Sequence, residues 1–305
     1  MASPRCTVVV VALHGGRNLE ACLEQLGAQG AACVVMLGPN MDAAAVWRDR
    51  FPSVRFVDAA ALPVPWRRRR GIEAADGEWV ALLEDSSLPQ ARWSEAIAEA
   101  FGAPAVAAVG GPVAIGTGVS YRQAALACCE YGRFHPSAIR RLASGGEATR
   151  SGAFDVERLP GNNVAYRKSA LRLVCPEEEP LLETQANAAL LAAGRRLQVH
   201  PDMAVEYRPA DNHGARLAER FRHGRLYGGM RARGASVGAR IGWLLKALLL
   251  PFVLSGRGLR AMRVALPPRA WCAVGAWVCC METAWAAGEA AGYVAGPGRT
   301  LEGWR

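Results

Sequence analysis

The sequence predicts an α/β protein with a mostly parallel central sheet flanked by helices, followed by an apolar helical extension at the C-terminal end. Three observations predict this fold. Short apolar runs alternate with segments of helical periodicity over the first hundred residues. One of those runs ends in two adjacent carboxylates, Glu84 and Asp85. The last seventy residues lose the alternation and become strongly apolar, with arginines between their apolar segments.

The first buried strand is predicted over residues 7–13, where β-branched residues follow one another without polar alternation. Gly15 and Gly16 form the turn after it, and Asn18 is expected to cap a helix that reaches about residue 29. The elements expected next are strand 32–37, helix 42–50, strand 54–57, helix 67–75 and a strand from residue 79. This alternation predicts parallel strands joined by right-handed crossovers.

Glu84 and Asp85 end the strand that begins at residue 79. Ligands of open α/β sheets bind outside the carboxyl ends of the strands. Paired carboxylates in that place suit a hard divalent cation, which in turn neutralises a diphosphate. The alternative reading is a solvated exit from a strand into a loop.

The pattern changes after residue 105. The expected elements are strand 106–109, helix 119–131, a polar glycine-rich loop over 143–158, a short strand after Asn163, helices 168–174 and 179–193, and strand 197–200.

The C-terminal region has two apolar segments, 241–255 and 271–281. The first is shorter than the roughly 20 residues of a membrane span and contains Lys246 and Pro251. Glycines at 288, 292 and 296 have the spacing that lets helices approach closely. Arginines and tryptophans around both segments favour re-entrant or interfacial helices on an anionic leaflet. The alternative is a set of buried helices in a soluble C-terminal subdomain.

Composition narrows the classes of partner. The chain has 305 residues, 51% of them hydrophobic, and a formal net charge of +9, which suits nucleotide phosphates or anionic lipid. We expect no nucleic-acid partner, because no binding motif is present and aromatic residues are not interleaved with the basic ones. The nine cysteines follow no metal-ligand spacing, and Met1–Arg5 lead directly into a strand. We therefore expect a reducing, cytoplasmic setting for the N-terminal part.

Several segments resemble motifs of one enzyme family. Residues 68–80, RRRGIEAADGEWV, are similar to its "ARNxGIxxAxGEYV" segment, and Glu84-Asp85 stand where it has a metal-binding Asp-x-Asp. Residues 161–171 resemble its "GxNxAfRRxxL", and residues 182–186 align with the start of its "EDxDLxxRLxxxG". Together, from about residue 6 to 235, they resemble the bacterial, membrane-associated type of family 2 glycosyltransferases, inverting enzymes with the GT-A nucleotide-sugar fold.

The resemblance implies a reaction and a set of roles. An acceptor hydroxyl attacks the anomeric carbon of a UDP-, GDP- or dTDP-linked sugar, and Mg²⁺ or Mn²⁺ held by Glu84 and Asp85 assists the leaving diphosphate. Glu183 aligns with the catalytic base, and the run Glu177–Glu179 is a competing source of that base. The remaining roles fall to two groups of residues: Arg68, Arg69, Gly15 and Asp42 for the donor and its phosphates, and Asn162, Asn163, Arg222, His223 and Arg225 for the acceptor.

The resemblance also implies a division and a location. Residues 1–235 are expected to form the transferase domain, with a nucleotide-binding half to about residue 105 and an acceptor half after it. Residues 236–305 are expected to hold it at the cytoplasmic face of the bacterial inner membrane, where the acceptor is lipid-linked or a glycan of the cell envelope.

Three departures from the family pattern keep a second hypothesis open. The acid that usually follows the second strand is missing, Tyr207 replaces the histidine of "VxH", and the metal motif lacks its third position. The alternative is a catalytically inactive member that serves as a nucleotide-sugar sensor or as a membrane partner of another transferase.

Overall fold

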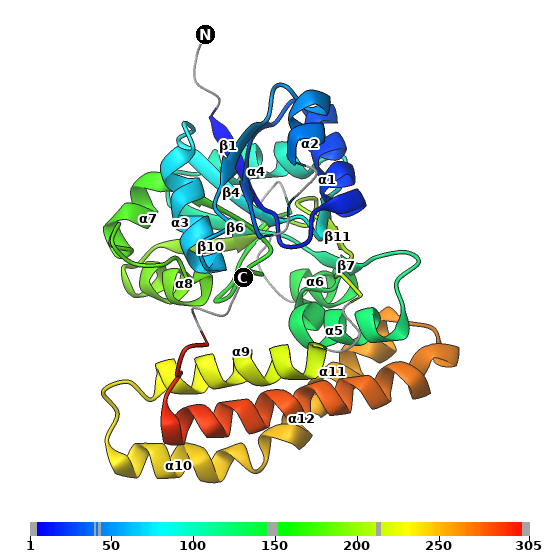
Figure 1. Cartoon of the computed structure of the whole chain (residues 1–305), viewed down its shortest axis with the longest axis vertical. Coiled ribbons are helices and arrows are strands. Elements are labelled where there is room, and N and C mark those ends of the chain that lie inside the picture. Colours follow the sequence, from blue (N-terminus) through cyan, green and yellow to red (C-terminus); the bar gives the residue numbers. More distant parts are fainter. Residues whose placement is uncertain (1–4, 40, 42–43, 145–151, 212–214, 301–305) are drawn as a thin grey trace. The chain divides into compact units, whose positions relative to one another are not determined.

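The computed structural model describes residues 5–39, 41, 44–144, 152–211 and 215–300 (Figure 1). The described chain forms two compact units. The first contains the residues up to Ala114 together with Phe134–Arg208. The second contains Ile115–Arg133 and the residues from Pro209 onward.

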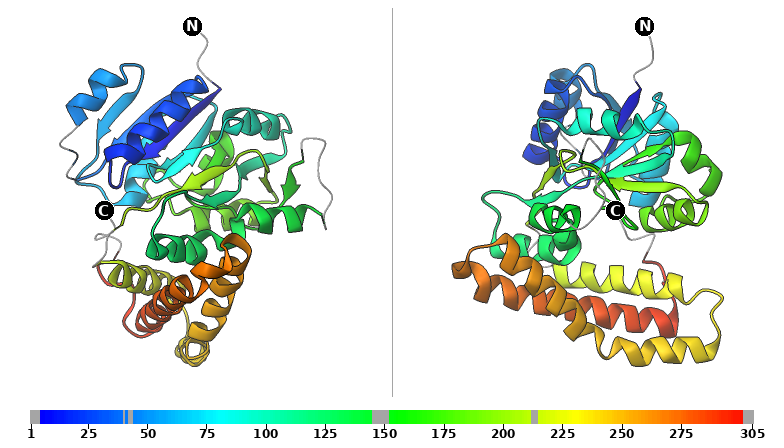
Figure 2. Two further views of the ribbon diagram at one scale, coloured as in Figure 1. Left: turned by 90° about the vertical axis from the view of Figure 1, so that its right-hand side faces the viewer. Right: turned by 180° about the vertical axis from the view of Figure 1, so that it is seen from behind.

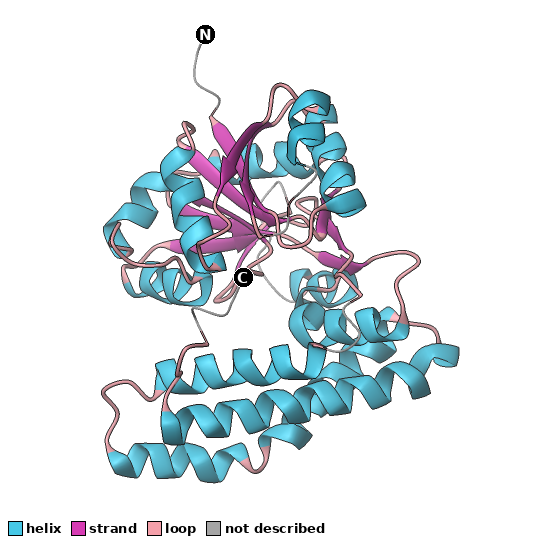
Figure 3. Ribbon diagram, viewed as in Figure 1, coloured by secondary structure: helices cyan, strands magenta, loops and turns pink. Residues whose placement is uncertain are grey.

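The first unit is built on an eight-stranded sheet in the order β3-β2-β1-β4-β9-β6-β10-β8 (Figure 3). Neighbouring strands from β3 to β4 are parallel, as are β6 and β10, whereas β9 runs antiparallel to both of its neighbours. The strands are β1 (Cys6–Val11), β2 (Ala32–Leu37), β3 (Arg55–Asp58), β4 (Trp79–Glu84), β6 (Val106–Gly110), β8 (Phe154–Asp155), β9 (Asn163–Arg167) and β10 (Arg196–Val199). The predicted fold, a mostly parallel sheet flanked by helices, is confirmed.

Helices cover both faces of this sheet (Figure 1). On one side lie α1 (Gly16–Ala28) and α2 (Ala44–Arg50), and on the other α3 (Val64–Ala74), α7 (Lys168–Val174) and α8 (Glu183–Ala192). Every residue of β4 is buried, which explains the continuous apolar run in its sequence. Two further helices, α4 (Trp93–Phe101) and α6 (Pro136–Ala143), complete the helices of this unit.

A second, three-stranded sheet has the order β5-β11-β7, and β5 (Ser87–Pro89) begins two residues after Asp85 (Figure 2). The other two strands are β7 (Val113–Ile115) and β11 (Val205–Tyr207). The backbone is therefore held by strand pairing before and after the two carboxylates: β4 precedes them in the large sheet, and β5, which follows them, pairs antiparallel with β11.

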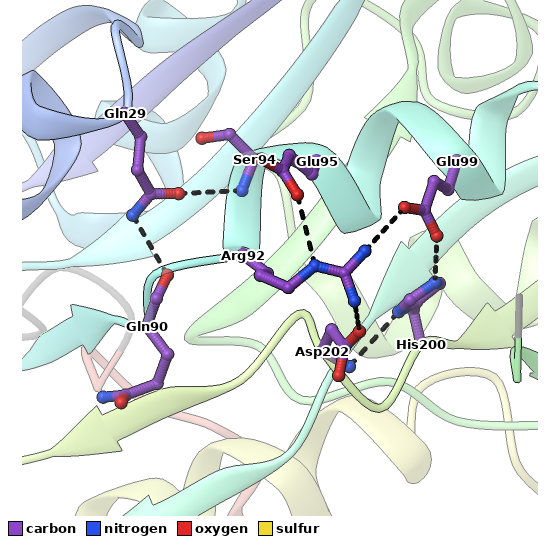
Figure 4. A network of polar contacts seen from close by, with 8 residues as sticks. All are labelled: Gln29, Gln90, Arg92, Ser94, Glu95, Glu99, His200 and Asp202. Atoms are coloured by element: carbon purple, nitrogen blue, oxygen red, sulfur yellow. Dashed lines mark hydrogen bonds and ion pairs between the residues drawn. The ribbon is translucent and has the colours of Figure 1, made fainter.

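A polar network ties α4 to the turn between β10 and β11 (Figure 4). Arg92 pairs with Asp202 at 2.5 Å and with Glu99 at 2.9 Å. The buried His200 accepts the N–H of Asp202 at Nδ1, so its Nε2 carries the proton that faces Glu99 at 3.2 Å. The network fixes the turn that leads into the second sheet.

Three predicted helix starts are wrong. The helix predicted over residues 67–75 begins at Val64. The first helix begins at Gly16 with Gly15 as its N-cap residue, and the Asn18 amide donates instead to the carbonyl of Arg208. The helix predicted from residue 179 begins at Glu183. Pro180, which cannot donate a backbone hydrogen bond, lies in the irregular segment before it.

The second unit is helical, with α12 (Trp271–Ala295) packed against α5 (Tyr121–Tyr131), α9 (Arg216–Arg231), α10 (Val237–Ala247) and α11 (Leu250–Ala265). The second unit does not begin at the predicted boundary after residue 235. It also includes α5 and α9, because these two helices pack with the C-terminal helices. In the described ranges no single helix has both the length and the apolar composition to cross a membrane. Only α10 and α11 taken together do, and they are bent by 52° at their junction.

Four glycines form the contact between α9 and α12, and we call this contact the glycine interface. Gly224 and Gly228 face the backbone of Trp285 and Glu289, and Gly288 and Gly292 face the backbone of α9. A Cβ at any of the four would lie closer to the opposite backbone than a real side chain can approach. The regular glycine spacing seen in the sequence therefore produces close helix packing within this unit.

Candidate functional site

The candidate site lies in the first unit, where β1 and β4 end side by side. Val11 of β1 pairs with Glu84 of β4, and the Asp85 N–H donates to the carbonyl of Val11 at 3.2 Å. The predicted position of the two carboxylates at the carboxyl ends of parallel strands is therefore what the fold produces.

One oxygen of Asp85 organises the loop that follows β1. Asp85 Oδ2 accepts the backbone N–H groups of Leu13, His14 and Gly15 at 3.1, 2.8 and 2.6 Å. Gly15 has φ 64°, and a Cβ there would lie 2.6 Å from the Trp47 ring, so glycine is required at this turn. Gly15 was predicted to serve the donor and its phosphates, but its N–H donates to Asp85.

The other carboxylate oxygen of Asp85, Oδ1, has different surroundings. Asp85 is fully buried, and its Oδ1 has no hydrogen-bond partner among the described residues. Burial raises the pKa of Asp85, and the three backbone N–H groups work against that rise. A buried carboxylate oxygen without a partner calls for an explanation, and a bound cation would supply one.

Arg68 contacts both Glu84, a predicted metal ligand, and Glu183, the predicted catalytic base. Its guanidinium lies 2.9 Å from Glu84 Oε1 through Nη2. It also meets both oxygens of Glu183, with Nε 2.6 Å from Oε1 and Nη1 3.0 Å from Oε2. All three side chains are buried, so one cation is shared between two acids inside the protein.

Glu183 is the first residue of α8, where the helix dipole favours a negative charge. Burial raises its pKa, and the charge of Arg68 lowers it in part. Gly161 lies against this carboxylate, since a Cβ at Gly161 would be 3.4 Å from the Glu183 carboxyl carbon. The competing acids Glu177–Glu179 are exposed on the segment before α8, so the geometry favours Glu183 as the buried acid of the site.

The two asparagines after Gly161 have different surroundings, although both are fully buried. Asn163 accepts from the Trp93 ring N–H and donates to the carbonyls of Pro112 and Met203, which holds β9 to its neighbours. Asn162 donates to Ser87 Oγ at 3.0 Å, and its Oδ1 has no partner among the described residues. Their predicted contact with an acceptor stays a prediction, and Asn162 has the polar atom available for it.

The three neighbouring arginines on α3 point in different directions. Arg67 is fully buried and donates to the carbonyls of Ala59, Leu62 and Ala12. Arg69, predicted to bind the donor, donates to the carbonyls of Pro176 and Glu179 at 2.8 and 3.0 Å and so holds the segment before α8. Asp42, the fourth predicted donor residue, lies outside the described residues.

The sequence reasoning missed three features of this site. These are the backbone cradle around Asp85, the pairing of Arg68 with both acids, and the contact of Ser87 with Asn162. The three successive arginines at 67–69 could have predicted part of this arrangement. Consecutive residues of a helix are about 100° apart, so the three side chains must reach different neighbours.

The remaining predicted acceptor residues lie on α9, in the second unit. Arg222 is exposed, and Arg225 donates to the carbonyl of Gly296 at 3.2 Å. Burial, followed by the charge of Arg220, lowers the pKa of His223 to about 4. His223 is therefore a neutral side chain near pH 7, and its predicted role stays a prediction.

The residues fit a divalent cation in one respect. The described residues contain no group of three His, Cys, Asp or Glu side chains placed to hold a metal. A magnesium-type site that is completed by substrate phosphates and water needs only one or two carboxylates, and Asp85 Oδ1 has no hydrogen-bond partner among the described residues that would compete for it. Glu84 Oε1 is held by Arg68, so Asp85 is the stronger candidate of the two predicted ligands.

No family model matches the chain, and no curated protein matches it in sequence. Solved structures do match. A mannosyltransferase from Pyrobaculum calidifontis, in complex with GDP-Man and Mn²⁺, is 16% identical with a TM-score of 0.58, covering 96% of this chain and 88% of the other. The fold is GT-A.

Two further structures are less similar. GalNAc-T7 with UDP, GalNAc and Mn²⁺ is 12% identical with a TM-score of 0.49, covering 67% of this chain and 44% of the other. S. aureus TarS 1–349 is 14% identical with a TM-score of 0.47, covering 92% of this chain and 90% of the other.

Proposed function

We propose that this protein is an inverting glycosyltransferase that moves a sugar from a nucleotide-diphosphate donor to an acceptor hydroxyl. The observation that carries the proposal is a pair of buried acids: Asp85, whose Oδ1 has no hydrogen-bond partner among the described residues, and Glu183, which Arg68 links to Glu84. The GT-A fold supports it, and the similar mannosyltransferase binds GDP-Man and Mn²⁺. We further propose a lipid-linked or cell-surface glycan acceptor at the cytoplasmic face of the bacterial inner membrane.

The residues divide the chemistry between them. The acceptor oxygen forms a bond to the anomeric carbon, the bond from that carbon to the diphosphate oxygen breaks, and the diphosphate keeps the electron pair. Glu183 accepts the acceptor proton, a role that suits a buried carboxyl whose pKa is raised. Arg68 holds Glu183 in place through a hydrogen bond to Oε2 and an ion-pair contact with Oε1.

Asp85 anchors the donor side. Its Oδ2 keeps the loop after β1 in place, and its Oδ1 is the ligand for Mg²⁺ or Mn²⁺. When bound, such a cation neutralises charge on the diphosphate. Asn162 Oδ1, which also lacks a partner among the described residues, accepts a hydroxyl of the sugar or of the acceptor.

The test is nucleotide release from a panel of UDP-, GDP- and dTDP-sugars by the full chain, with Mn²⁺, with Mg²⁺ and with a chelator. Slow hydrolysis of the donor provides a readout without a known acceptor. We expect release from one donor class, dependent on metal, and lost in Asp85→Asn and Glu183→Gln. Glu178→Gln is the matched control, because this acid is exposed on the segment before α8.

Two results would overturn the proposal. Tight donor binding without turnover, with any acceptor extract added, would favour the inactive nucleotide-sugar sensor. Absence of donor binding in calorimetry would remove the nucleotide sugar altogether and leave the fold alone.

A further inference from the structure

Helix α10 is apolar on two opposite sides. Trp243 and Ala247 pack against Tyr293 of α12. Ile241 and Leu245 lie about 200° around the helix from these residues, since each position turns about 100°. They are exposed, so one apolar side of α10 is used by the core and the other is open.

The open side continues into α11. Leu248 and Leu249 join the two helices, and Phe252 and Val253 follow in the first turn of α11. Leu248 is 70% exposed and Phe252 is 77% exposed, which makes them among the most exposed large apolar residues of the described chain. We call this surface the α10–α11 face: Ile241, Leu245, Leu248, Leu249, Phe252 and Val253. Six exposed large apolar side chains on two consecutive helices are more than the single ones scattered over an ordinary protein surface.

The charges around this face have one sign. Residues 220–281 contain no Asp or Glu, whereas basic residues recur throughout this stretch. Those on α10 and α11 that are exposed include Lys246, Arg257, Arg260 and Arg263. Exposed apolar side chains bordered by cations suit a partner that offers both hydrocarbon and negative charge.

We propose that the α10–α11 face docks on an anionic lipid bilayer, with its apolar side chains in the interfacial region and the neighbouring cations at the lipid phosphates. This inference rests on the membrane setting of the proposed function, but it concerns binding alone. The bent pair α10–α11 is compatible with lying in the interface, because each helix is too short to span.

A second copy of this chain is a poorer occupant. A symmetric contact through this face would bring the same exposed cations of two copies together, with no acid in residues 220–281 to pair with them. Anionic lipid supplies the missing counter-charge and receives the apolar side chains at the same time.

The test is flotation of the full chain with vesicles of phosphatidylcholine, with or without phosphatidylglycerol, in the absence of any nucleotide sugar. We expect binding that requires phosphatidylglycerol and weakens with salt. The double variant Leu248→Asn/Phe252→Asn should bind about tenfold more weakly or worse, because two large apolar side chains no longer enter the bilayer. The matched control is Leu173→Asn/Val46→Asn, which changes two apolar residues of the first unit that are 71% and 61% exposed.

The charge is tested separately. Arg257→Gln/Arg260→Gln should reduce binding to vesicles with phosphatidylglycerol, whereas Arg172→Gln/Arg195→Gln, exposed residues of the first unit, should not. No flotation with any vesicle would overturn the proposal, and so would equal losses in the test and control variants. Dissociation of a dimer by Leu248→Asn/Phe252→Asn, without vesicle binding, would assign the face to a second copy. Because no turnover is measured, failure here leaves the transferase proposal standing, and the reverse also holds.

Discussion

Arg68 bridges two acids that are 99 residues apart in the sequence, Glu84 and Glu183, and all three side chains are buried. Removing one member of a buried charge network leaves the others uncompensated, which costs far more than an exposed ion pair. Burial raises the pKa of Glu183, the acid expected to act as base, and the pairing with Arg68 lowers it in part. The pairing also makes the site sensitive to pH in a direction that can be worked out.

Glu183→Gln should reduce donor turnover by roughly a hundredfold to ten-thousandfold, because the amide cannot accept the proton. In the unchanged protein the base must be ionised, and burial raises its pKa above the ordinary value of 4.5. Turnover should therefore fall as the pH drops through that raised pKa. The measurement is the pH profile of kcat/KM. A flat profile down to pH 4, or full activity of Glu183→Gln, would exclude this role.

Arg68→Met should move the acidic limb of the same profile to higher pH, since the charge of Arg68 lowers the pKa of Glu183. Arg68→Lys keeps the charge, so its acidic limb should lie close to that of the unchanged protein. The free energy of unfolding should fall more at neutral pH, where Glu183 must ionise without its partner, than at acidic pH. A purely structural role of Arg68 would lower stability and activity without moving the limb.

Asp85→Asn and Asp85→Ala should separate the two roles of this carboxylate, which are to hold the loop after β1 and to bind the metal. Asparagine keeps one oxygen for the N–H groups of Leu13, His14 and Gly15, so we expect a near-normal thermal midpoint with loss of metal-dependent turnover. Alanine leaves three donors without that acceptor and should destabilise by about 1–3 kcal/mol or more. Thermal unfolding and turnover of both variants check this. Metal-dependent activity in Asp85→Asn would contradict the assigned ligand.

At the scale of elements, the glycine interface makes the sharpest prediction. Gly228→Ala places a Cβ against the backbone of Glu289, so we expect a loss of about 1–3 kcal/mol in the free energy of unfolding. Gly242→Ala on α10 is the control. Nothing lies within 4 Å of its Cβ, and it should be neutral or stabilise by about 0.5–1 kcal/mol. Chemical denaturation compares the two, and equal effects would mean that close packing is not what these glycines provide.

The strands of the first half could be predicted because their signal is local. The run at residues 32–37 is apolar throughout and became β2 with the predicted limits. Helix starts were less predictable where they depend on distant partners. Asn18 suits an N-cap by type, but its amide bonds to the carbonyl of Arg208, which the sequence pattern alone does not place nearby.

For the site, the sequence predicted which residues take part but not the contacts that they make. Glu84, Asp85, Arg68 and Glu183 were all named from motifs, and the fold brings Arg68, Glu84 and Glu183 into direct contact. What the motifs did not contain is how each polar atom is used. The backbone cradle of Asp85 and the turn of Arg69 toward Pro176 follow from tertiary packing, which no short window of sequence records.

For the whole molecule, the two compact units imply that a shortened chain will fail at a predictable place. A chain ending at residue 235 lacks α10–α12, and α5 then loses its apolar partners Met262, Val274 and Val278. We expect such a chain to aggregate and to bind hydrophobic dyes, as seen by size-exclusion chromatography and fluorescence. A monomeric, cooperatively unfolding product of 1–235 would contradict this, and would support the boundary predicted from the sequence.

The membership of α5 in the helical unit has a consequence for biosynthesis. Its partner α12 begins at Trp271, and α5 ends at Tyr131, so the two are made far apart in time. At ordinary translation rates the delay is on the order of ten seconds, during which the apolar surface of α5 has no native partner. An apolar surface that waits this long for its partner is prone to aggregation, so we expect a ribosome-associated chaperone to bind α5 until α12 has been made.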